Sequence, residues 1–231
     1  MESLLEIDNR LFGEERKLHP PCKVVMGEYI LYPSDKGYPH TYLPAYSELF
    51  EPIRNSVNSV LEIGIAQGGS LALWNEYFYN ANLIFGMDYN GCSAYDRRLA
   101  EDLINSKRNS FVSFDNILKE SLSKYTKVKY NINLDAYTDQ ACSDALLINN
   151  NKKYDIIIDD GSHSEADMFY FIENYGLKCL NPGGLLIIED CNLDSFQNMS
   201  APYNYEFFGY KGLENLGYPD NMFIIRKLGY E

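Results

Sequence analysis

The sequence predicts an α/β fold built around a parallel β-sheet, and three observations lead to this class. First, short runs of β-branched apolar residues alternate with helical patterns from residue 57 onward, as expected for parallel strands joined by helices. Second, the first of these strands runs into a glycine-rich turn at 64–69, which is how a buried strand passes into a helix. Third, acidic residues stand at the ends of several predicted strands, where ligands gather in such sheets.

The first part of the chain precedes this alternation. Ser3 and Glu6 have the spacing of a capping box, and the apolar residues that follow predict a short helix near the start. After a Pro-Pro break, residues 24–26 and 29–32 are expected to form short extended pieces, and residues 34–42 form a polar, turn-rich loop.

The elements that follow can be taken in order. Pro44 begins a helix whose apolar face includes Tyr46 and Phe50. Strands are predicted near 58–64, 83–88, 127–134, 154–159 and 185–190, and helices near 69–79, 94–106, 140–149 and 165–179. In the last part of the sequence, strands are predicted at 205–210 and 222–226, separated by a turn-rich stretch at 212–220. With 231 residues and 45% hydrophobic content, the chain is expected to form one main domain.

The charge composition of the chain limits the kinds of molecule that it can bind. The chain has 20 Lys and Arg against 33 Asp and Glu, a net charge of -13, which repels nucleic acid and anionic membranes. It shows no apolar run of spanning length and no signal-peptide pattern at its start. We therefore predict a cytoplasmic protein that binds neither nucleic acid nor membrane, and we expect the five cysteines to be reduced thiols.

The glycine turn favours a nucleoside cofactor. A dinucleotide fingerprint needs a second glycine where this chain has Ala66. The order Glu62-x-Gly64-x-x-x-Gly68-Gly69 resembles instead motif I of class I methyltransferases, which use S-adenosylmethionine (SAM). A tight turn without any ligand is the alternative interpretation.

Asp88 ends the second predicted strand. A carboxylate at this point can accept hydrogen bonds from both ribose hydroxyls of a nucleoside. The residue is therefore compatible with SAM and with NAD alike, and the alternative is a solvated acid at a strand end.

Three further carboxylates end the fourth and fifth predicted strands: Asp160, Glu189 and Asp190. They should converge at one edge of the sheet, where they would repel one another unless a cation lies among them. Oxygen ligands of this kind favour Mg²⁺, with Mn²⁺ or Ca²⁺ as alternatives. His163 follows Asp160 closely and is a suitable proton acceptor near neutral pH. Helix capping by the acids and a structural role for the histidine are the alternatives.

In combination, these motifs resemble metal-dependent sugar O-methyltransferases, the family of macrolide-sugar and rhamnosyl O-methyltransferases. The resemblance rests on Ser34-Asp35-Lys36-Gly37 with His40 and Tyr42, Leu61-Glu62-Ile63-Gly64 with Gly68-Gly69-Ser70 and Trp74, Asp139-Gln140, Asp159-Asp160-Gly161-Ser162-His163, Pro182-Gly183-Gly184, and Glu189-Asp190. It implies a Rossmann-like seven-stranded methyltransferase sheet with a reversed last strand, helices on both faces and a short N-terminal appendage.

The resemblance also implies roles for individual residues. Asp160, Glu189 and Asp190 would hold the metal, with His163 as general base and Asp160 counted with it as catalytic. Residues 1–43 would form the appendage with a loop that closes over SAM, and residues 44–231 the methyltransferase domain. The implied SAM contacts are Glu62, Gly64, Gly68, Ser70, Asp88, Asp139, Gln140, His40 and Tyr42.

The expected activity is SAM-dependent and Mg²⁺-dependent methylation of a sugar hydroxyl, such as that of rhamnose on a glycan, a glycoside or a nucleotide sugar. Alternatives are a catechol-type O-methyltransferase, an NAD-dependent oxidoreductase or epimerase, and a SAM-binding domain without activity. The resemblance leaves room for a homo-oligomer. The chain is expected to lack the large N-terminal domain of the macrolide-sugar enzyme, and its tail after Asn192 matches no pattern of the family. Aromatic residues at 203–210 could stack on a sugar, although strand aromatics more often belong to a core.

Overall fold

The computed structural model describes residues 1–18, 34–37, 40–66, 68–89, 118–119, 122–197, 200–215 and 218–229. The helix predicted at 94–106, the extended pieces predicted at 24–26 and 29–32, and two of the five cysteines, Cys22 and Cys92, lie outside these residues. The other three, Cys142, Cys179 and Cys191, are buried free thiols.

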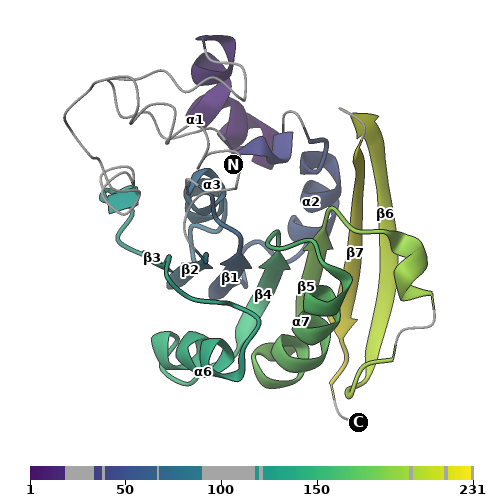
Figure 1. Ribbon diagram of the computed structural model, residues 1–231. Helices are drawn as coiled ribbons and strands as arrows, with labels where there is room; N and C mark the ends of the chain where they lie inside the picture. Colours follow the sequence, from purple (N-terminus) through teal and green to yellow (C-terminus); the bar gives the residue numbers. More distant parts are fainter. Residues whose placement is uncertain are drawn as a thin grey trace, which may run out of the picture.

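Seven strands form one sheet in the order β3-β2-β1-β4-β5-β7-β6 (Figure 1). Their bounds are β1 Ser59–Ile63, β2 Leu83–Met87, β3 Val128–Asn131, β4 Tyr154–Asp159, β5 Leu180–Glu189, β6 Tyr205–Asn215 and β7 Tyr218–Lys227. The first five strands are parallel, and β7 runs antiparallel to both of its neighbours. The predicted seven-stranded sheet with a reversed last strand is therefore confirmed.

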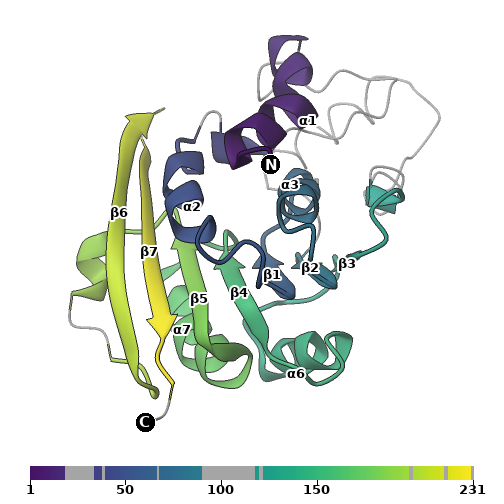
Figure 2. The same cartoon turned by 180° about the vertical axis from the view of Figure 1, so that it is seen from behind.

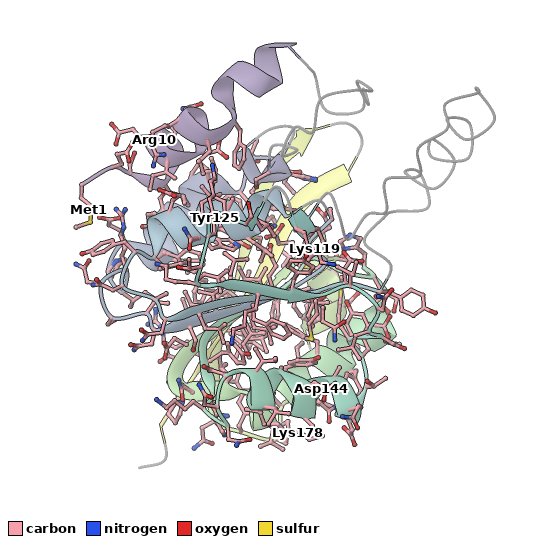
Figure 3. All side chains as sticks on the ribbon, turned by 90° about the vertical axis from the view of Figure 1, so that its left-hand side faces the viewer. Met1, Arg10, Lys119, Tyr125, Asp144 and Lys178 are labelled. Carbon is pink, nitrogen blue, oxygen red and sulfur yellow. The ribbon has the colours of Figure 1, made fainter. Side chains whose placement is uncertain are left out.

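Helices cover both faces of this sheet, as predicted (Figures 1 and 2). Their bounds are α1 Leu4–Leu18, α2 Leu43–Phe50, α3 Gly69–Tyr77, α6 Asp139–Ile148 and α7 Glu165–Lys178, with short 3₁₀ helices η1 Asp35–Gly37 and η2 Leu193–Phe196. Figure 3 views the sheet along its edge: Arg10 marks the side of α1, and Asp144 and Lys178 mark the side of α6 and α7. None of the described helices is long and apolar enough to cross a membrane.

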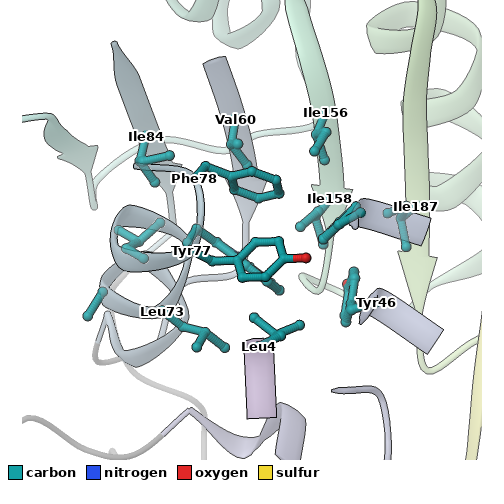
Figure 4. Packing of buried hydrophobic residues seen from close by; sticks show 14 of the residues in the cluster. Leu4, Tyr46, Val60, Leu73, Tyr77, Phe78, Ile84, Ile156, Ile158 and Ile187 are labelled. Atoms are coloured by element: carbon teal, nitrogen blue, oxygen red, sulfur yellow. The ribbon is translucent and has the colours of Figure 1, made fainter. Parts of the chain in front are cut away.

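Two buried clusters fill the space between the sheet and its helices. Successive side chains of a strand point to opposite sides of the sheet, so alternate residues belong to different clusters. Ile156 and Ile158 pack with α1, α2 and α3, whereas Ile157 packs with α6 and α7. Figure 4 shows Leu4 of α1 beside Tyr46 in the first cluster. The described part of the predicted appendage thus shares a core with the sheet, and the boundary at residue 43 stays a prediction.

The tail differs from the prediction. The stretch expected to be a turn, 212–220, is mostly paired: β6 continues to residue 215 and β7 begins at residue 218, because cross-strand pairing outweighs the local turn preference. Tyr203 is buried and donates its hydroxyl to the carbonyl of Ile172. Phe207 and Phe208 on the outer strand are 50% and 40% exposed, so the expectation that strand aromatics belong to the core is wrong for these two.

Candidate active site

The turn after β1 is built against the end of β4. Gly64 has a φ of +80°, and a Cβ atom there would lie 1.9 Å from the backbone oxygen of Asp160. Only glycine permits both the backbone conformation and this approach. The amide of Gly64 donates to the carbonyl of Met87 at 2.8 Å, and the amide of Asp160 donates to the carbonyl of Ile63 at 2.9 Å. The ends of β1, β2 and β4 are thereby joined at one point.

Asp88 lies at the end of β2, as predicted, and closes the same turn. Its Oδ2 atom accepts hydrogen bonds from the amides of Ile65 and Ala66, each at 3.1 Å. Ala66 has a φ of +41°, a left-handed conformation that is uncommon for a residue with a side chain. The carboxylate therefore stabilises the turn itself, and its contact with a ribose stays a prediction.

Glu62 is fully buried below this turn. Its Oε2 atom accepts a hydrogen bond from the indole of Trp74 at 3.0 Å, and the hydroxyl of Ser70 is a further partner. Burial raises the pKa of Glu62 to about 6, although the ammonium of Lys36 opposes the shift. Gly68, the residue before α3, has a φ of +83°. Glu62 and Ser70 thus form a polar core under the predicted cofactor turn, and whether they contact SAM stays a prediction.

Lys36 is the main residue of the site to which the sequence assigned no role. Its side chain is only 1% exposed, although lysine is rarely buried unless it is paired. The Nζ atom lies 3.3 Å from Oε1 of Glu62, 3.0 Å from Oδ2 of Asp160 and 2.8 Å from Oε1 of Glu189. Burial disfavours the charged ammonium, but these three carboxylates outweigh it and raise the pKa of Lys36. We call Lys36, Glu62, Asp160 and Glu189 the ion cluster.

A candidate cation site lies beside the ion cluster. Asp160, His163 and Asp190 each bring one ligand atom to within 4.8 Å of the others, and Nε2 of His163 is 4.0 Å from Oδ2 of Asp190. His163 and Asp190 have φ values of +56° and +50°; such conformations cost energy and cluster at functional sites. Two carboxylates and an imidazole are suitable ligands for a divalent cation, so the residues present fit a metal ion.

Glu189 differs from Asp160 and Asp190, the other two predicted metal ligands, because it is not part of the candidate cation site. It is buried, and besides Lys36 it accepts a hydrogen bond from the hydroxyl of Tyr46. Burial raises its pKa, and Lys36 opposes the shift. Asp160 and Asp190 thus belong both to the predicted metal ligands and to the cation site that the structure assembles, whereas metal binding by Glu189 stays a prediction. His163 can either bind a cation or accept a proton, because both use the same lone pair.

His40 and Tyr42 anchor the end of the predicted covering loop. The Tyr42 hydroxyl donates to Oδ1 of Asp190 at 2.5 Å, and the His40 ring stacks on that of Tyr42. The buried carboxylate of Asp220 lies 2.8 Å from Nδ1 of His40 and accepts two hydrogen bonds from Thr41, from its amide and its hydroxyl. Asp220, which sequence reasoning left in a turn, therefore fixes this loop to β7.

Asp139 and Gln140 begin α6. The carboxylate of Asp139 contacts Lys178 at 2.6 Å and Tyr170 at 3.0 Å, both on α7, and Gln140 donates to Asp144 at 2.8 Å. These contacts lie on the surface of the helical layer, so a SAM contact from either residue stays a prediction.

A tyrosine fixes the loop that carries Asp160 and His163. The Tyr137 hydroxyl donates to Oδ1 of Asp159 at 2.6 Å and accepts from the amide of Ser162 at 3.0 Å. Burial raises the pKa of Asp159 to about 7, and the hydrogen bond from Tyr137 opposes the shift. Tyr137 was not singled out from the sequence, because no local pattern connects it to a loop more than twenty residues away.

The strand order, the glycine turn after β1 and the acid after β2 define the class I methyltransferase fold. Comparison with solved structures agrees. MycE methyltransferase from the mycinamycin biosynthetic pathway, solved with Mg, SAH and mycinamycin VI, matches 98% of this chain and 55% of its own with a TM-score of 0.57 and 19% identity. The O-methyltransferase TomG from Streptomyces achromogenes, solved with SAM, matches 99% of this chain with a TM-score of 0.51 and 10% identity.

In sequence, the chain is similar to sugar O-methyltransferases. It is 27% identical over 178 residues to 8-demethyl-8-alpha-L-rhamnosyl tetracenomycin-C 2'-O-methyltransferase of Streptomyces olivaceus, a match that covers 74% of this chain and 38% of the relative. It is 28% identical over 161 residues to mycinamicin VI 2''-O-methyltransferase of Micromonospora griseorubida, covering 67% and 32%. No protein-family model matches the chain. The matched part of each relative is thus only about a third of its length.

Proposed function

We propose that this chain is a SAM-dependent O-methyltransferase that requires a divalent cation and acts on a sugar hydroxyl. The observation that carries the proposal is the contact between Gly64 and Asp160, because it places the predicted cofactor turn directly against the candidate cation site. A methyl donor and an acceptor hydroxyl must lie side by side for transfer. The names of the relatives support a rhamnose or macrolide sugar as acceptor.

Each residue of the site has a task in this proposal. Bound SAM would supply the methyl group, and a bound Mg²⁺ would supply Lewis acidity to the acceptor hydroxyl. Asp160 and Asp190 hold the cation, with Glu189 as the third predicted ligand. His163 accepts the acceptor's proton at Nε2, a function suited to an imidazole near neutral pH.

The cofactor-binding residues would surround the turn after β1. Gly64 and Gly68 give the turn its positive φ values, and the amides at the start of α3 would face the ligand. Asp88 would bind the ribose, while the loop that ends in His40 and Tyr42 covers the cofactor. We also retain a homo-oligomer as part of the proposal.

Calorimetric titration tests the cofactor. We expect S-adenosylhomocysteine to bind in the micromolar range and NAD⁺ not to bind; the reverse result would support an oxidoreductase. Methyl transfer should then be measured with rhamnosides and with catechols as competing acceptors, with MgCl₂ and with EDTA. Transfer to the rhamnoside that EDTA abolishes is the expected result, whereas transfer to catechol alone would support the catechol-type alternative.

A further inference from the structure

Lys36 connects three strand ends through one buried ammonium. Glu62, Asp160 and Glu189 stand at the ends of β1, β4 and β5, which are adjacent in the sheet. Their carboxylate oxygens lie 2.8 to 3.3 Å from Nζ of Lys36. Lys36 itself comes from η1, outside the sheet, so four separate segments of the chain meet at this ion cluster.

The charges of the ion cluster make this ammonium necessary. Three carboxylates on neighbouring strands repel one another, and buried charge is tolerated only when it is paired and hydrogen-bonded. Among the residues that the structure describes, Lys36 is the cation that contacts all three. Its backbone is fixed as well, because its amide donates to Oγ of Ser34 and its carbonyl accepts from the amide of Tyr42.

The ion cluster lies between the two halves of the proposed site. Glu62 stands two residues before Gly64, whose turn would bind the cofactor, and Asp160 also belongs to the candidate cation site. A displacement of either carboxylate would therefore alter both halves, because Gly64 and the backbone of Asp160 are in contact.

We propose that Lys36 is a positioning residue that keeps the cofactor turn and the cation site assembled before any divalent cation binds. The proposal rests on the proposed function, since it concerns the same site. With Lys36 in place, the cofactor turn needs no metal ion to hold its shape. Without Lys36, the three buried carboxylates have no cation among them, so they take up protons or move apart unless an external cation replaces the missing charge.

The test is the dependence of S-adenosylhomocysteine binding on Mg²⁺, measured by calorimetry in MgCl₂ and in EDTA. For the native chain we expect the dissociation constant to change by less than about threefold between the two conditions, which means little coupling between the sites. For Lys36→Met we expect affinity in EDTA to fall by about tenfold or more and to recover in part with Mg²⁺, a coupling of ordinary size.

Lys227→Met is the matched control. Lys227 is also buried, but its Nζ atom donates to the carbonyls of Gly176 and Leu177 at the end of α7 and of Leu180 at the start of β5, away from the site. Its removal is the same chemical change away from the site, so binding should stay independent of Mg²⁺. A Mg²⁺ dependence shared by both variants would overturn the proposal, because it would reflect general destabilisation.

Lys36→Met leaves buried carboxylates unpaired, which can prevent folding. A measurement on the native chain therefore stands beside it: hydrogen exchange of the amides of Asp160 and Tyr42 without cofactor and in EDTA. We expect both amides to be protected, and rapid exchange of Asp160 would overturn the proposal.

The outcomes separate this inference from the proposed function. Native chain that binds S-adenosylhomocysteine only with Mg²⁺ would overturn the role of Lys36 and leave the function standing. Equal binding by Lys36→Met and native chain in EDTA would do the same. If the native chain binds S-adenosylhomocysteine in neither condition, the proposed function itself is contradicted.

Discussion

At the scale of single residues, Asp160 and His163 lie in the same candidate cation site but differ in their contacts and exposure. Asp160 contacts Lys36 through Oδ2 and also lies within the candidate cation site. His163 is 42% exposed and has Asp190 at 4.0 Å. Asp160 therefore belongs to both the candidate cation site and the ion cluster, whereas the imidazole of His163 is partly exposed to solvent.

Asp160→Asn should weaken the cation site without removing the cofactor turn. The amide is nearly the same size but carries no charge, so we expect Mg²⁺ affinity to fall about tenfold or more, as for losses around metal sites. Affinity for S-adenosylhomocysteine with Mg²⁺ present should change little. Calorimetry of both ligands is the measurement, and unchanged Mg²⁺ affinity would contradict a metal role for Asp160.

The variant His163→Gln distinguishes a role of His163 as general base from a role as metal ligand. If His163 accepts the proton, methyl transfer should fall by about 100-fold or more, the usual size of a general-base contribution, while Mg²⁺ affinity is retained. Transfer kinetics and Mg²⁺ titration of the same preparation are the measurements. A parallel loss of Mg²⁺ affinity would instead make His163 a ligand, as the group Asp160, His163 and Asp190 also permits.

At the scale of elements, the turn between β1 and α3 depends on the close approach of two backbones. Gly64 and Gly183 both have a φ of +80°, but a Cβ on Gly64 would strike the backbone oxygen of Asp160 at 1.9 Å, whereas one on Gly183 would meet nothing within 4 Å. The two glycines thus have the same φ value, Gly64 with a clash for a Cβ and Gly183 without one.

This pair gives a matched prediction. Gly183→Ala should lower the free energy of unfolding by about 1 to 2 kcal/mol, the cost of a left-handed conformation for a residue with a Cβ. Gly64→Ala should lower it by more, because the ends of β1 and β4 must also move apart. Urea unfolding of both variants measures the difference, and equal losses would show that the contact with Asp160 contributes nothing.

At the scale of the whole molecule, the helical layers are held to the sheet by buried apolar clusters and by a few buried ions. Lys227 of β7 donates to the carbonyls of Gly176 and Leu177 in the last turn of α7, at 2.6 and 3.1 Å, and to the carbonyl of Leu180 at the start of β5, at 3.0 Å. Cations at this end of a helix are favourable, because its last carbonyls lack partners within the helix. Lys227 therefore fastens α7 to the outer part of the sheet.

The stability of the fold should depend on pH through this lysine. Burial lowers the pKa of Lys227 to about 8 from its ordinary value of 10.5. Between these two values the unfolded chain binds more protons than the folded chain, so this group makes the free energy of unfolding rise with pH. We expect the stability of the native chain relative to Lys227→Met to increase from pH 8 to pH 10.5. Urea unfolding across this range measures it, and a constant difference would contradict the prediction.

Within the described residues, the sequence by itself determined the succession of strands and helices along the chain, the glycine turn and the acids at the strand ends. These features follow from local periodicity and turn chemistry, which involve residues close together along the chain. Gly64, Asp88, Asp160 and Asp190 were accordingly placed at the correct ends of the strands.

Only the tertiary structure decided which charges meet. Lys36 reaches Asp160 and Glu189 across 124 and 153 positions of sequence, and His40 reaches Asp220 across 180. Such pairings depend on the order of strands in the sheet and on where residues 34–37 and 40–42 lie against its edge, and no local pattern encodes either. Metal binding by Glu189 stays a prediction from the sequence, whereas its ion pair with the buried Lys36 could be found only in the folded chain.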